Sequence, residues 1–125
     1  MQIEEAHKDS FDILLAASLT YPEAWEDHPW GETVAKVGKK LFFTISFHKE
    51  MLHITFKLSE SNGSAISLPF AEPAGYGLGK SGWVTCSFSA EDEIPVELLL
   101  DWLDESYRAI APKKLVKMLV EGDQP

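Results

Sequence analysis

The chain has 125 residues, with 20 acidic and 11 basic side chains, and its formal net charge is −9. Its composition, 45% hydrophobic and 25% charged, is typical of one globular domain and excludes disordered and collagen-like chains. The single cysteine excludes an internal disulfide, and the N-terminus lacks the basic and apolar parts of a signal peptide. No apolar run approaches the roughly 20 residues of a membrane span, so we expect a cytoplasmic domain over residues 1–125 with no membrane partner.

The first segment predicts a helix. Over residues 8–19, Phe11, Leu14 and Leu15 recur at the spacing of a helical face. Pro22 ends this pattern, because the residue before a proline avoids the helical region. Residues 23–31 are acidic and aromatic, and they indicate either a short edge strand or a loop.

Three segments with the features of β-strands follow. Residues 33–37 are β-prone, and Gly38, Lys39 and Lys40 have the composition of a hairpin turn. Residues 41–48 and 52–58 alternate between apolar and polar side chains, as half-buried strands do. The alternation in the first of these predicts one face with Leu41, Phe43, Ile45 and Phe47 and another with Phe42, Thr44, Ser46 and His48. An antiparallel meander over one core is the simplest arrangement.

The next segments predict a short helix at 65–69, a glycine-rich loop at 73–82 and a strand at 83–88. In that strand Cys86 alternates with apolar neighbours, which indicates an inert core thiol. Trp83 falls on the opposite face, where its indole covers a second apolar surface, caps the long helix or contacts a partner.

The end of the chain predicts the clearest helix, over residues 94–111, with Pro95 suited to its first turn. Its expected buried stripe is Val96, Leu99, Leu100, Leu103, Tyr107 and Ile110. Beyond Pro112, a short final helix is indicated by Leu115, Met118 and Leu119. We expect residues 121–125 to form a disordered tail.

One loop is similar to a phosphate-binding motif. Residues 74–81 nearly match G-x-x-x-x-G-K-[ST], with alanine in place of the first glycine. That motif needs a strand before the loop and a helix after it, whereas here Pro69 and Pro73 precede the loop and a strand follows. We therefore do not expect nucleotide hydrolysis. The four histidines lack metal-ligand spacing, so we expect no metal and no cofactor.

The charge is unevenly distributed along the chain. Residues 1–32 carry a net charge of −7, whereas residues 33–58 contain five lysines and one glutamate. Lysines often protect exposed strands from edge pairing. The alternatives are a basic β-surface for a polyanion or a surface for a protein partner.

Three ordered stretches resemble the MmcQ/YjbR family and together cover about residues 10–118. The first is Tyr-Pro-Glu-Ala-Trp-Glu-Asp-His-Pro-Trp-Gly at 21–31, followed by residues 34–42. The second is Tyr-Gly-Leu-Gly-Lys-Ser-Gly-Trp-Val-Thr at 76–85. The third begins with Ile94 and Pro95 and continues into Leu-Asp-Glu-Ser-Tyr at 103–107.

This resemblance implies a two-layer α+β fold like that of the secretion chaperones. An antiparallel sheet of about five strands would carry helices on one face, in the order α-β-β-β-α-β-β-α. It also implies a double-wing arrangement of strands and helices, for which the family is described as DNA-binding.

We therefore expect a non-enzymatic binding domain with no catalytic residues. The expected ligand is DNA, bound weakly and in a salt-sensitive way through Lys36, Lys39, Lys40, Lys57, Gly79, Lys80 and Trp83. The alternative is a protein partner, a chaperone-like role or a homodimer, using an aromatic surface that includes Trp25, Trp30 or Trp83. The net charge of −9 is unfavourable for DNA binding, so the lysines would have to act locally.

Overall fold

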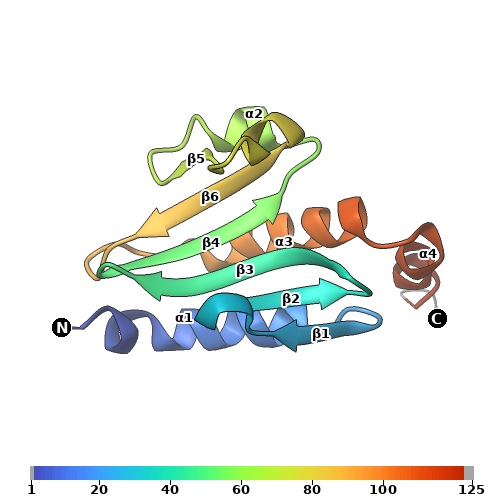
Figure 1. Cartoon of the computed structure of the whole chain (residues 1–125), viewed down its shortest axis with the longest axis horizontal. Helices are drawn as coiled ribbons and strands as arrows, with labels where there is room; N and C mark the ends of the chain where they lie inside the picture. Colours follow the sequence, from blue (N-terminus) through green and yellow to red (C-terminus); the bar gives the residue numbers. More distant parts are fainter. Residues whose placement is uncertain (1, 123–125) are drawn as a thin grey trace.

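A computed structural model describes residues 2–122, in which four helices and six strands form two layers (Figure 1). The helices are α1 (Ile3–Ser18), α2 (Asn62–Ala65), α3 (Val96–Ile110) and α4 (Lys113–Gly122). The strands are β1 (Ala24–Asp27), β2 (Thr33–Val37), β3 (Lys40–His48), β4 (Met51–Lys57), β5 (Ala71–Pro73) and β6 (Trp83–Phe88). Two 3₁₀ turns are η1 (Pro29–Gly31) and η2 (Leu78–Ser81). The α+β class is confirmed.

The strands form one antiparallel sheet in the order β1-β2-β3-β4-β6-β5. Residues 23–31 contain an edge strand, β1, and a sixth strand, β5, forms the opposite edge. The predicted order of elements is otherwise close. No helix among the described residues combines the length and apolar character needed to cross a membrane.

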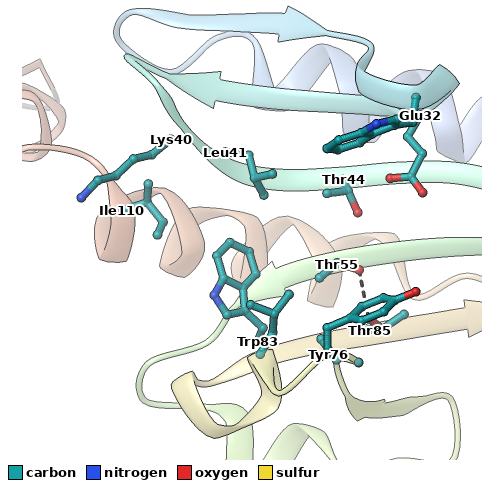
Figure 2. Close-up of a pocket in the computed structure, with 13 residues that line it drawn as sticks. Glu32, Lys40, Leu41, Thr44, Thr55, Tyr76, Trp83, Thr85 and Ile110 are labelled. Atoms are coloured by element: carbon teal, nitrogen blue, oxygen red, sulfur yellow. Dashed lines mark hydrogen bonds between the residues drawn. The ribbon is translucent and has the colours of Figure 1, made fainter.

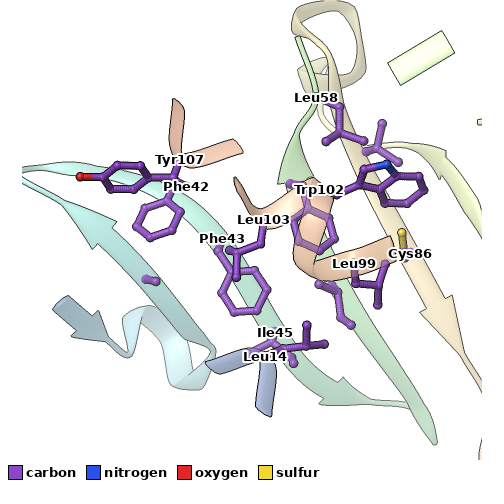
Figure 3. Close-up of a cluster of buried hydrophobic side chains, with 14 of the residues drawn as sticks. Leu14, Phe42, Phe43, Ile45, Leu58, Cys86, Leu99, Trp102, Leu103 and Tyr107 are labelled. Atoms are coloured by element: carbon purple, nitrogen blue, oxygen red, sulfur yellow. The ribbon is translucent and has the colours of Figure 1, made fainter. Parts of the chain in front are cut away.

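The helices α1 and α3 pack on one face of the sheet and bury its apolar side chains (Figure 3). Alternate residues of β4 and β6 supply much of this core, including Ile54, Phe56 and Cys86. Trp102 of α3, which the predicted stripe omitted, also lies in it. Both α1 and α3 contact β3 and β4, and we call the face of the sheet turned away from these two helices the open face.

Several helix boundaries differ from prediction, and α1 begins at Ile3 rather than at residue 8. The helix expected at 65–69 is a single turn over Asn62–Ala65, because the Asn62 amide donates to the Leu58 carbonyl and Pro69 prevents extension. The helix α4 continues to Gly122, so residues 121 and 122 are helical rather than a loose tail. The rest of the predicted tail, 123–125, lies outside the described residues.

A bulge in β3 changes which side chains face the core. Lys36 pairs with Leu41 while the adjacent Ala35 pairs with Phe43, so Phe42 is an extra residue. Phe42 and Phe43 are both fully buried, and Leu41 turns to the open face. The predicted faces of Leu41 and Phe42 were therefore wrong, because strict alternation fails where a bulge inserts a residue.

Ser106 of α3 stabilises this bulge. Its hydroxyl accepts a hydrogen bond from the Lys57 backbone N–H at 2.8 Å and donates to the Phe42 carbonyl. The neighbouring Tyr107 ring packs edge-on against Phe42, and its hydroxyl donates to the Pro22 carbonyl at 2.7 Å. One turn of α3 thus fixes the beginning of β3 and the connection between α1 and β1.

We predict that Ser106→Ala lowers the free energy of unfolding by about 1–3 kcal/mol, because two backbone groups lose their buried partner. Urea unfolding measures the change. Ser67→Ala removes an exposed hydroxyl bonded to the Ser64 carbonyl and should change stability by less than about 0.5 kcal/mol. Equal effects of the two substitutions would contradict this role for Ser106.

Candidate functional site

The strand register brings four predicted lysines to one end of the sheet. Lys57, the last residue of β4, pairs with Trp83, the first residue of β6. Lys40 begins β3 beside this end of β4, and Lys39 precedes it in the turn. Lys80 lies in η2, just before β6. We call this region, defined by Lys39, Lys40, Lys57 and Lys80, the basic end.

The helix α4 adds charge close to the basic end. Figure 2 shows Lys40 beside Ile110, the last residue of α3, and α4 begins three residues later with Lys113 and Lys114. These two lysines were not among the predicted site residues. Among the described residues, neither they nor the four lysines of the basic end form an ion pair.

Acidic side chains gather at the opposite end of the sheet. The turn between β3 and β4, the start of α1 and the segment after β6 meet there, and Lys49, Glu50 and Glu91 line one shared hollow. This acidic end contains Glu4, Glu5, Glu50, Glu91, Asp92 and Glu93. Part of the net charge of −9 therefore lies far from the basic end, whereas Glu60, Asp101, Asp104 and Glu105 share a hollow with Ser59, two residues after Lys57.

Lys36 has a different environment from the other predicted lysines. Its Nζ lies 2.7 Å from an Asp27 carboxylate oxygen and 5.3 Å from the centre of the Trp25 ring. The hydrogen bond from Lys36, together with the backbone N–H of His28, holds the pKa of Asp27 below its usual value. The Lys36 charge is thus matched by a carboxylate and contributes little to a cationic surface.

Gly79 has a packing role in η2. A Cβ at this position would lie 2.6 Å from the Pro73 Cβ, so only glycine lets η2 approach β5 so closely. Its N–H donates to the Ala74 carbonyl at 3.2 Å and is already satisfied within the loop. Gly79 therefore shapes the loop that carries Lys80.

Trp83 lies on the open face, opposite Cys86 as predicted, and lines a cleft of about 740 Å³ (Figure 2). The floor of the cleft comes from β3, β4 and β6, with Leu41, Thr44, Thr55 and Thr85. One wall contains Trp30 and Glu32 near η1, and the other contains Tyr76 and Leu78 near η2. The cleft reaches the basic end at Lys40 and Ile110.

Two aromatic side chains of the walls are uncovered. Trp30 is 96% exposed and Tyr76 is fully exposed. Both have positive φ, 53° and 59°, a conformation that bulky residues rarely adopt. Strain of this kind persists where the surrounding structure imposes it, often at binding sites. The predicted partner surface included Trp30, but Tyr76 was missed.

The single cysteine, Cys86, lies in the core. Cys86 is fully buried, and this burial raises the pKa of its thiol to about 12, so the thiolate is absent at neutral pH. Over the described part of the chain, no three His, Cys, Asp or Glu side chains gather in a way that would hold a metal ion.

A family model described as YjbR matches residues 19–109, which is most of the chain. The chain belongs to the YjbR family. The crystal structure of Deinococcus radiodurans protein DR2400, with family-model domain DUF419, is similar at a TM-score of 0.66 and 24% identity. The similarity covers 87% of this chain and 86% of that one, and it supports the fold alone. A search of curated proteins finds no match.

We predict that Trp30→Gly is more stable than Trp30→Ala by about 1 kcal/mol. Both substitutions remove an exposed indole, but only glycine relieves the cost of positive φ. The difference between their free energies of unfolding, measured in urea, isolates the energetic cost of the positive φ at residue 30. A Trp30→Gly protein no more stable than Trp30→Ala would show that residue 30 is not strained.

We also predict that the Cys86 thiol does not react with a thiol reagent in the native protein at pH 8, and that it reacts rapidly in urea. The raised pKa and the burial both suppress the thiolate. Absorbance of the released chromophore follows the reaction. Fast labelling without denaturant would mean that β6 is accessible from the core side.

Proposed function

We propose that this member of the YjbR family binds DNA, without catalysing a reaction on it, through the basic end of its sheet. The observation that carries the proposal is the convergence of Lys39, Lys40, Lys57 and Lys80 without carboxylate partners among the described residues. Lysines contact phosphates as point charges and read little sequence, so the expected binding is sequence-tolerant.

Two turns at this end carry lysines that could contact a phosphate backbone. One is the turn between β2 and β3, with Lys39 and Lys40, and the other is η2, with Lys80. Because Lys36 is matched by Asp27, it is left out of the proposed contact set. Lys113 and Lys114 extend the proposed surface along α4.

Few cations take part, so the affinity should be modest and depend strongly on salt. Contact with about four phosphates predicts that affinity falls about a hundredfold between about 50 and 200 mM salt, because bound counterions are released. Titration of a fluorescently labelled DNA duplex, followed by anisotropy at both salt concentrations, measures this slope.

The double substitution Lys39→Glu with Lys40→Glu should weaken binding at low salt by at least about tenfold. A matched control, Lys8→Glu with Lys49→Glu, makes the same change in net charge in α1 and at the far turn of the sheet. The control should bind almost as well as the unaltered protein. Failure to bind DNA at low salt, or equal losses in both variants, would contradict the proposal.

A further inference from the structure

We infer that the cleft on the open face binds unpaired nucleobases, so that the protein prefers single-stranded DNA to a duplex. The inference rests on the proposed function, because the lysines of the basic end would hold the phosphates of the same strand. It adds a second kind of contact, which the lysines alone do not supply.

The cleft offers aromatic surfaces from three separate elements. Trp30 comes from η1, Tyr76 from the loop before η2 and Trp83 from β6. Trp30 and Tyr76 are almost free of protein contacts on their ring faces, as their exposure shows. Bases stack on such rings in many single-strand binding proteins, and the stacking is tolerant of sequence because every base has a π-face.

The floor of the cleft suits the edges of bases. Thr44, Thr55 and Thr85 present hydroxyl groups, which can both donate and accept hydrogen bonds. The Thr55 and Thr85 hydroxyls lie 3.0 Å apart and bond to each other, so each keeps further capacity (Figure 2). A volume of about 740 Å³ is in the usual range for sites that enclose small organic groups.

The charges around the cleft determine where the backbone and the bases of a bound strand would lie. Lys40 lies at the end of the cleft that joins the basic end, and Glu32 lies on the wall near η1 (Figure 2). A phosphate is attracted to Lys40 and repelled by Glu32, so the backbone of a bound strand lies toward Lys40. A strand therefore enters with its backbone along the lysines and its bases toward Glu32.

A duplex cannot use this cleft, because its bases are stacked and paired inside the helix. Only an unpaired strand can turn bases outward onto protein rings while its phosphates remain on the lysines. The combination of uncovered rings, hydroxyl floor and adjacent unpaired lysines thus favours a single strand over both a duplex and a purely apolar ligand.

The test compares two labelled oligomers of equal length and charge, a thymidine strand and an abasic strand, by anisotropy at low salt. The thymidine strand should bind at least about tenfold more tightly, since each stacked base contributes about five- to hundredfold. Trp30→Ala and Tyr76→Ala should each reduce this preference and leave abasic binding unchanged. Trp30→Phe should retain most of it.

Trp25→Ala is the matched control. Trp25, which belongs to β1, also has an exposed indole, but it does not line the cleft. It should leave the preference within about twofold of that of the unaltered protein. Lys39→Glu with Lys40→Glu should weaken binding of both oligomers equally.

The outcomes separate the two proposals. Equal, salt-sensitive binding of both oligomers would overturn the inference and leave DNA binding through the lysines intact. No binding of either oligomer at low salt would overturn both. Sedimentation of the protein alone as a dimer that Trp30→Ala dissociates would also overturn the inference, because a second copy would then cover the cleft.

Discussion

The contact between the Ser106 hydroxyl and the β3 bulge controls how the two faces of the sheet are used. A bulge leaves backbone groups without ladder partners, and burying them unsatisfied would be costly. By bonding to the Phe42 carbonyl and the Lys57 N–H, Ser106 makes the irregularity stable in the core. The bulge in turn allows two consecutive phenylalanines to face the helices and moves Leu41 into the floor of the open-face cleft. The same bulge in β3 therefore shapes both the core and the candidate site.

The candidate site also depends on where the charged residues lie along the sheet, which the net charge does not reveal. Antiparallel pairing places the ends of β2 and β4 beside the beginnings of β3 and β6, and Lys40 and Lys57 occupy two of these positions. The acidic residues of the opposite turns and of the start of α1 lie at the far end. The protein has a net charge of −9, yet its basic end can be locally cationic, because none of its four lysines forms an ion pair among the described residues.

Much of the fold was predictable because most segments obey simple patterns. Residues 52–58 and 83–88 alternate without interruption, and the structure has strands there with the expected faces. Phe42 was misassigned because a bulge leaves no mark in a pattern of apolar residues. The pairing of Lys36 with Asp27 depends on the register of β1 with β2, which sequence spacing does not reveal. Trp30 and Tyr76 lie next to glycines, a signal of tight turns, but their meeting across one cleft required the tertiary structure.

Four lysines, Lys39, Lys40, Lys57 and Lys80, share one end of the sheet, so a local positive field exists on a protein of negative net charge. Exposed charges farther apart than the Debye length, about 10 Å at 0.1 M salt, are largely screened, so the net negative charge of the protein does little to repel a distant polyanion. Within that distance, the field of an approaching polyanion would favour orientations in which the basic end leads. In the proposed complex the glutamates of the far end would face away from the strand, so neighbouring strands would be held apart rather than cross-linked. Such a molecule would coat a nucleic acid strand without condensing it.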